Sequence, residues 1–149
     1  MFFFSRKSQI IIPDYLYDQM MDHARDEYPN ECYGVLVGNP MNKIVFEVNR
    51  IYNLENDRTI DRYSFNPQEL KLIQHTAKIQ SLDILGFYHS HPDRGDKPSG
   101  YDREAAYPGY SYIIISINKE KKISAKSWSF SSEKEPFKED EITVRKQKT

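Results

Sequence analysis

Cysteine is almost absent from this sequence, since Cys32 is the only one in 149 residues. A single cysteine cannot build a disulfide framework or a zinc site made of several thiolates. Any metal that the chain holds must therefore be bound by histidine and carboxylate side chains. Two other signatures are missing: without a Pro-Cys-x-x-Cys segment a zinc deaminase is excluded, and without a His-Glu-x-x-His string so is that class of metalloprotease.

Long hydrophobic runs are also missing from the sequence. No stretch approaches the roughly 20 apolar residues that a membrane-spanning helix needs. Residues 1–7, Met-Phe-Phe-Phe-Ser-Arg-Lys, do not resemble a signal peptide, because the apolar run is too short and its positive charges follow it. We therefore expect a soluble, cytoplasmic protein with no membrane partner. The three phenylalanines could form an interface patch, which leaves a homodimer open.

The sequence has no excess of either charge, with 21 basic and 22 acidic residues and a net charge of −1. This balance argues against a broad phosphate-binding surface, so we expect no nucleic-acid partner. The apolar fraction is modest at 38%, but 11 Tyr, 8 Phe and 1 Trp can bury much area. Without repeats or low-complexity linkers, residues 1–149 are most simply one domain that is long enough to bury a core.

Periodicity, caps and turn residues predict an alternation of strands and helices. Strands are expected at 9–12, 31–38, 43–53, 63–65, 84–88, 110–117 and 123–130. Helices are expected at 14–27, from Pro67 onward after an Asn66 cap, and briefly after Ser99. A surface loop is expected at 53–62. Residues 131–149 are charged and sparse in apolar groups, so they form either a loose tail or an edge strand.

Two histidines near the end of the apolar strand 84–88 have the pattern of metal ligands. Side chains two residues apart on a strand point the same way, so His89 and His91 can present ring nitrogens to one ion. A third ligand must come from elsewhere, and Asp102 can fold back over the strand end. A His/His/Asp set leaves one tetrahedral position open, which is typical of catalytic rather than structural zinc.

Two further residues fit hydrolytic chemistry beside such a metal. Glu31, at the mouth of another buried strand, can act as the general base that moves a proton to a leaving amine. Ser99 can donate a hydrogen bond to a developing oxyanion. Each feature has an ordinary alternative: Ser99 and Asp102 could form only a helix capping box, and Glu31 could be a strand-end acid. We expect His23 and His75, which lie in predicted helices, to be ordinary surface or half-buried histidines.

The combination of these segments resembles the JAMM (MPN+) metallopeptidases, also called the Mov34/JAB family. Residues 89–92, His-Ser-His-Pro, and 99–102, Ser-Gly-Tyr-Asp, are separated by six residues and resemble the family motif without a gap. Residues 29–38, Pro-Asn-Glu-Cys-Tyr-Gly-Val-Leu-Val-Gly, resemble its upstream glutamate segment. The resemblance covers roughly residues 9–130, and the Pro-Gly-Tyr turn at 108–110 is similar to that of the small prokaryotic branch.

The resemblance implies an α/β (α+β) fold with a curved mixed β-sheet flanked by helices, a JAMM/MPN-like (cytidine-deaminase-like) sandwich. It also implies that His89, His91 and Asp102 bind zinc, that Glu31 is the general acid/base and that Ser99 assists at the oxyanion. The implied reaction is hydrolysis of a peptide or isopeptide bond after the Gly-Gly tail of a ubiquitin-like or β-grasp sulfur-carrier protein. The short loop 92–98 favours a thin, extended tail over linkage-selective cleavage of ubiquitin chains.

The sequence departs from the family at one position and leaves two rival functions open. The family often has Cys two residues after the glutamate, where this chain has Tyr33, and we interpret the change as packing variation. A non-catalytic MPN-like scaffold is one rival, although such members lose zinc ligands that are present here. A cysteine hydrolase using Cys32 with His89 is the other, and it requires an exposed, activated thiol.

Overall fold

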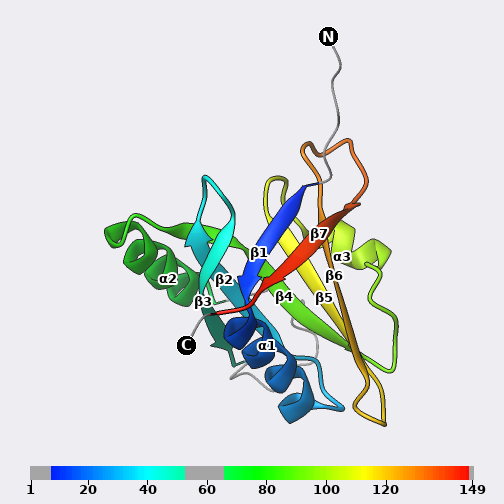
Figure 1. The fold of residues 1–149 in the computed structure, drawn as a ribbon. Helices are drawn as coiled ribbons and strands as arrows, with labels where there is room; N and C mark the ends of the chain where they lie inside the picture. The colour runs from blue at the N-terminus through cyan, green and yellow to red at the C-terminus, as the bar shows by residue number, and fades with distance from the viewer. Residues whose placement is uncertain (1–7, 53–65, 148–149) are drawn as a thin grey trace.

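The computed structural model of the chain describes residues 8–52 and 66–147. The loop expected at 53–62, the strand expected at 63–65 and the phenylalanines near the N-terminus lie outside these residues. The elements in chain order are β1 (Gln9–Pro13), α1 (Asp14–Glu27), β2 (Tyr33–Asn39), β3 (Ile44–Ile51), α2 (Pro67–Ile79), β4 (Asp83–Pro92), α3 (Gly100–Ala105), β5 (Ser111–Ile117), β6 (Ile123–Ser129) and β7 (Lys138–Arg145) (Figure 1). None of the described helices is long and apolar enough to cross a membrane.

The strands form one curved mixed sheet in the order β1-β3-β2-β4-β5-β6-β7, and this sheet closes into a barrel. β4 pairs with β5 in parallel, while β2 pairs with β3 and β4 in antiparallel fashion. The predicted curved mixed sheet flanked by helices is confirmed. The closure of the sheet was not predicted. It depends on β1, which pairs with β3 at a single aligned pair, Ile11 and Ile44, and with β7 at the far end of the chain.

The charged C-terminal segment is a strand, as one of the two expected alternatives had it, but it pairs on both sides and so does not lie at an edge. β7 pairs in parallel with β1, where Ile10 aligns with Ile142, and antiparallel with β6. Ile142 packs against the apolar core. The buried carboxylate of Asp140 accepts a hydrogen bond from Ser129 Oγ at 2.9 Å, which helps to compensate for its burial.

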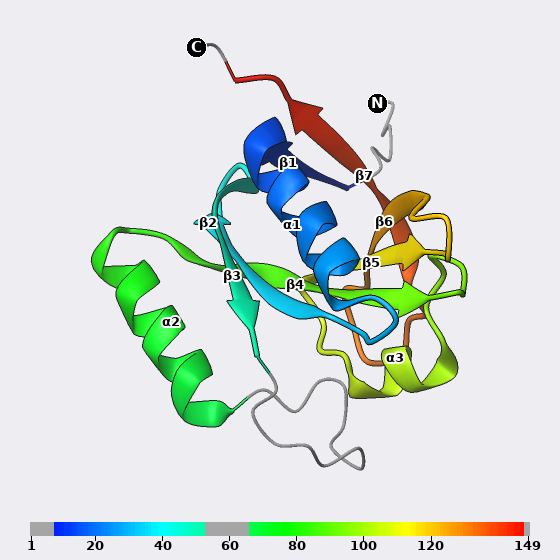
Figure 2. The same cartoon turned by 90° about the horizontal axis from the view of Figure 1, so that it is seen from below.

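Helix α1 covers one face of the sheet, and α2 and α3 lie on the other side of β4 (Figure 2). The apolar stripe of α1, Leu16, Met20 and Ala24, is buried and packs in a core with Tyr88 and three isoleucines of β5. On the opposite face, Phe87 of β4 belongs to a second core, against which α2 packs. β4 is therefore the central strand that both layers share, and its alternate side chains enter different environments.

The beginning of α2 follows the predicted capping pattern. The Asn66 side chain accepts a hydrogen bond from the Gln68 backbone N–H at 3.0 Å, and Pro67 occupies the first helical position. His75 on this helix is exposed, as predicted.

His23 of α1 is buried, so the prediction of a surface or half-buried side chain was wrong. Only 1% of the residue is exposed, and its Nδ1 lies 2.7 Å from the hydroxyl of Tyr88. The Tyr88 ring passes so close to Gly34 that a Cβ there would lie 1.9 Å from it, so glycine is required for this approach. Burial and, to a smaller extent, the nearby charge of Arg50 lower the pKa of His23 to about 4, against the opposing charge of Asp26.

This buried histidine predicts a loss of stability in acid. The unfolded chain has a histidine pKa near 6.5 and therefore binds the proton more readily than the folded chain. Stability is complete above about pH 6.5 and is lost as the pH falls toward 4. Between about pH 6.5 and pH 4, we expect the free energy of unfolding of the wild type to fall by about 3 kcal/mol more than that of His23→Gln. Urea denaturation at several pH values measures both free energies. The exposed control His75→Gln should follow the wild type, and parallel curves for the wild type and His23→Gln would contradict the assignment.

Candidate metal centre

His89 and His91 lie within the central strand rather than beyond its end. β4 pairs with β2, where Tyr33 aligns with His89, and with β5 as far as Pro92, which aligns with Ile117. The alignment with β5 therefore extends through Pro92. Proline cannot donate a backbone hydrogen bond, but the next residue can: the Asp93 N–H donates to the Ile117 carbonyl at 2.7 Å and continues the contact with β5. His89 is thus paired on both sides and His91 is paired with β5, which holds both histidines in a regular strand.

The alternation of β4 directs the side chains as predicted. His89 and His91 are each 1% exposed, and their rings lie together with centroids 4.8 Å apart. Ser90 points to the opposite face, where its Oγ accepts a hydrogen bond from the Cys32 backbone N–H at 2.8 Å. That contact ties β4 to the chain just before β2.

Helix α3 delivers the third candidate ligand, Asp102. Ser99 is the N-cap: its Oγ accepts from the Asp102 backbone N–H at 3.0 Å, and its own N–H donates to Asp102 Oδ2 at 2.7 Å. Both halves of the capping box are thus present. The capping role does not exclude a ligand role, because the same buried carboxylate also contacts both histidines.

Three donor atoms converge with separations that fit a metal ion. His89 Nε2 lies 3.0 Å from His91 Nε2, and the carboxylate oxygens of Asp102 lie 3.5 Å from His89 Nε2 and 3.2 Å from His91 Nε2. Tetrahedral ligands at about 2.0–2.2 Å from zinc lie roughly 3.3–3.6 Å from one another. Two imidazoles and a carboxylate are also a donor set suited to zinc. Within the described residues this is the one group of three with metal-ligand spacing, and all three members are buried.

The surroundings hold His91 in the tautomer that a ligand needs. Its Nδ1 lies 2.9 Å from the Gly95 carbonyl oxygen, which can only accept, so Nδ1 carries the proton and donates. Nε2 is then left with its lone pair toward the other donors. The loop 93–98 therefore has a structural role in orienting the ring.

Charge in the group also favours metal binding. Burial lowers the pKa of His89, and the hydrogen bond and charge of Asp102 only partly oppose this effect. Burial alone would raise the pKa of Asp102, but the two histidines beside it and the hydrogen bond from the Ser99 backbone N–H hold that pKa well below its usual range. A neutral imidazole and an ionised carboxylate are the protonation states that bind a metal ion.

Glu31 lies beside this group, directly before β2. β2 begins at Tyr33 rather than at Glu31, but the Ser90 N–H donates to the Cys32 carbonyl at 3.1 Å and continues the alignment. Since Tyr33 aligns with His89 in an antiparallel pair, Glu31 is level with His91. The side chain of Glu31 is 21% exposed, and its charge is close enough to raise the pKa of His89.

Two residues that the sequence analysis did not assign to the site hold the Glu31 carboxylate. The Tyr33 hydroxyl donates to Oε2 at 2.5 Å, and Arg94 Nη2 donates to Oε1 at 2.6 Å. The Tyr33 ring is also stacked near His89, with centroids 6.3 Å apart and planes 19° apart. Packing variation was therefore an incomplete interpretation of Tyr33. Its place two residues after Glu31, on the same side of an extended chain, was the signal for a contact.

Cys32 does not have the environment of a catalytic nucleophile. The residue is 2% exposed, and burial raises the pKa of its thiol to about 11. An active thiol needs an exposed site that lowers its pKa. The structure therefore argues against the cysteine hydrolase and supports a packing role.

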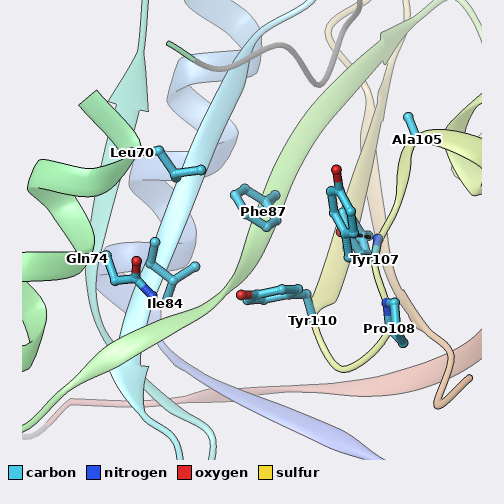
Figure 3. Close-up of a pocket in the computed structure, with 9 residues that line it drawn as sticks. Leu70, Gln74, Ile84, Phe87, Ala105, Tyr107, Pro108 and Tyr110 are labelled. Atoms are coloured by element: carbon cyan, nitrogen blue, oxygen red, sulfur yellow. Dashed lines mark hydrogen bonds between the residues drawn. The ribbon is translucent and has the colours of Figure 1, made fainter. Parts of the chain in front are cut away.

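An apolar cavity of about 500 Å³ lies on the same face of β4 as the histidines. Phe87, two residues before His89, is at its centre, between side chains of α2 and the tyrosines that follow α3 (Figure 3). The residues that line it are Leu70, Gln74, Ile84, Phe87, Ala105, Tyr107, Pro108, Tyr110 and Tyr112. A ligand that spans this cavity and the group of three would run along β4.

Comparisons with known proteins agree with this arrangement. The family model for prokaryotic homologs of the JAB domain matches residues 13–131. A desampylase from Haloferax volcanii is 35% identical over an alignment of 104 residues that covers 66% of this chain and 74% of that protein.

Solved structures with the same fold come from bacteria and archaea. A protein from Desulfitobacterium hafniense has a TM-score of 0.78 and 30% identity, with 93% of this chain and 94% of that one covered. A protein from Salinibacter ruber has a TM-score of 0.68 and 28% identity, with 91% and 92% covered. A JAB1/MPN domain protein from Archaeoglobus fulgidus has a TM-score of 0.56 at 18% identity, with 91% and 97% covered, which supports the fold alone.

Proposed function

Because the chain belongs to the family of prokaryotic homologs of the JAB domain, we propose that it is a zinc metallopeptidase acting on a ubiquitin-like or sulfur-carrier protein. The bond cleaved is a peptide or isopeptide bond after the C-terminal Gly-Gly-type tail of that protein. One observation carries the proposal above all: the buried donors of His89, His91 and Asp102 converge beside the carboxylate of Glu31. The similarity to a desampylase supports this class of reaction.

His89, His91 and Asp102 would hold the zinc ion through two Nε2 atoms and the carboxylate. When bound by three protein ligands, zinc lowers the pKa of a water to about 7 and polarises a carbonyl. The Glu31 carboxylate accepts the proton of the attacking water and passes it to the leaving amine. Hydrogen bonds from Tyr33 and Arg94 keep that carboxylate oriented toward the site.

Ser99 has a place in this chemistry through its hydroxyl hydrogen. Its Oγ already accepts a hydrogen bond from the Asp102 N–H, so the hydroxyl hydrogen can be donated to an oxyanion on the substrate. With Glu31 and all three ligands in place, nothing in the site favours a non-catalytic scaffold.

A narrow substrate fits the surroundings of the site better than a bulky one. The loop between Pro92 and Ser99 is short, and Arg94, Gly95 and Asp96 in it all contact residues of the site or of the sheet. The apolar cavity around Phe87 lies on the other side of the ligands along β4. A thin Gly-Gly tail can pass over the ligands with the acyl side of the scissile bond toward the cavity.

Removal of the metal tests the proposal. The zinc-loaded protein should hydrolyse a peptide that ends in Gly-Gly joined to the Nε or Nα of an amino acid, and a strong chelator should abolish that activity. Added zinc should restore it. His89→Ala should lose both zinc, measured by metal analysis, and activity. The exposed His75→Ala is the matched control and should keep both. If the wild type holds no zinc when it is offered, or its activity survives strong chelation, the proposed function is wrong.

A further inference from the structure

We propose that Arg94 is a specificity-determining residue that binds the α-carboxylate of the leaving group. The assignment rests on the proposed function and narrows it. A carrier protein extended by one amino acid after Gly-Gly would be a better substrate than one joined to a lysine Nε.

The order of features along β4 places Arg94 on the leaving-group side of the scissile bond. The apolar cavity lies at Phe87, the candidate ligands follow at His89 and His91, and Arg94 comes after the strand has ended. Glu31, which protonates the leaving amine in the proposed reaction, is level with His91 and touches Arg94. The acyl part of the substrate therefore lies toward the cavity, and the released amine lies toward Arg94.

Arg94 can bind an anion while it still holds Glu31. Among the described residues, Glu31 is the acceptor for the guanidinium, and that contact uses Nη2 alone. A guanidinium has about five N–H donors in a planar fork that matches a carboxylate. The Arg94 side chain is 44% exposed, so a substrate can reach the remaining donors.

The neighbouring acidic residues do not neutralise Arg94 within its loop. Both oxygens of Asp93 accept from the Tyr28 hydroxyl, at 2.9 and 3.0 Å. Asp96 accepts from Ser124 Oγ at 2.8 Å and lies 3.8 Å from Lys126 Nζ. Among the described residues, Glu31 is thus the acid paired with Arg94, and a leaving-group carboxylate can bind the exposed N–H donors that this pair does not use.

The covalent structure of the leaving group then decides which substrates can use Arg94. Hydrolysis breaks the C–N bond, the hydroxyl of water stays on the glycyl carbonyl, and the proton of that water passes through Glu31 to the amine. In a released amino acid, the carboxylate is on the carbon next to that amine. In a released lysine side chain, four methylene groups separate the amine from the α-carbon. Only the first leaving group brings an anion to Arg94 while its amine is at Glu31.

Three matched peptides test this specificity with the zinc-loaded full chain. They share a fluorescent acyl part ending in Gly-Gly and differ in the leaving group: alanine, alaninamide, or lysine amide joined through Nε. We expect kcat/KM to be about tenfold higher for alanine than for alaninamide, and lowest for the Nε-linked lysine. Arg94→Gln should bring the alanine-to-alaninamide ratio of kcat/KM down to about one, in addition to any loss that both peptides share because Glu31 is held less firmly. Arg94→Lys should retain part of the preference.

Lys97→Gln, which removes an exposed positive charge from the same loop, is the control and should keep the preference of the wild type. Equal rates for alanine and alaninamide in the wild type would overturn the role of Arg94 and leave the proposed function intact. A loss in Arg94→Gln that is equal for both peptides would also overturn it, because Arg94 would then act only by positioning Glu31. If the zinc-loaded wild type cleaves none of the three peptides, the proposed function is overturned, and this inference with it.

Discussion

Glu31→Gln should bind zinc like the wild type and lose turnover by about a thousandfold. Glutamine has nearly the same shape as glutamate, and its amide oxygen can still accept from Tyr33 or Arg94. It cannot take up a proton, so the transfer from water to the leaving amine loses its carrier. The metal ligands His89, His91 and Asp102 are unchanged. The measurements are zinc content and kcat for a Gly-Gly peptide.

The control for this variant is Glu47→Gln, which removes an exposed acid from β3. It should change neither zinc content nor kcat. Turnover of Glu31→Gln within about threefold of the wild type would remove Glu31 from the mechanism. Loss of zinc would show instead that Glu31 supports the metal centre itself. This outcome is measured separately because the charge of Glu31 acts on His89.

The centre of the fold could be predicted because its signals are local. The central strand was recognised from its apolar run, and the helix caps at Asn66 and Ser99 depend on residues only a few positions away. The strand period alone predicted that the side chains of His89 and His91 point to the same face of β4. Asp102 lies far from them along the backbone but close to Ser99, so the capping pattern placed it at the start of a helix.

The features that could not be predicted depend on contacts between distant segments. β7 reads as a charged tail because its apolar residues find their partners in β1, more than a hundred residues earlier. His23 carries no local sign of the Tyr88 hydroxyl that meets it in the core. Arg94 is one of many loop cations until the fold brings Glu31 to it. In each case a partner that is distant in sequence decides the environment of the residue. Local signals such as hydrophobic periodicity and helix-capping residues do not identify that partner.

Asp102→Asn should weaken zinc binding by about a hundredfold or more, because it removes the one anionic ligand. Both carboxylate oxygens lie near histidine nitrogens, and these contacts, with the hydrogen bond from the Ser99 N–H, hold the pKa of the buried acid well below its usual range. The asparagine oxygen can still accept from the Ser99 N–H, so the start of α3 should survive. Zinc affinity is measured by competition with a chromophoric chelator.

Ser99→Ala separates the two roles of this aspartate, because it removes the capping hydroxyl and leaves the carboxylate in place. It should cost about 1 kcal/mol of stability and lower kcat through the lost oxyanion donor, while zinc affinity stays within a few-fold of the wild type. If Asp102 were only a cap, Asp102→Asn would leave zinc affinity as unchanged as Ser99→Ala does. Both variants weaken the same capping box, but only Asp102→Asn removes the negative charge beside the histidines. A large loss of zinc in Asp102→Asn alone would therefore assign the carboxylate to the metal.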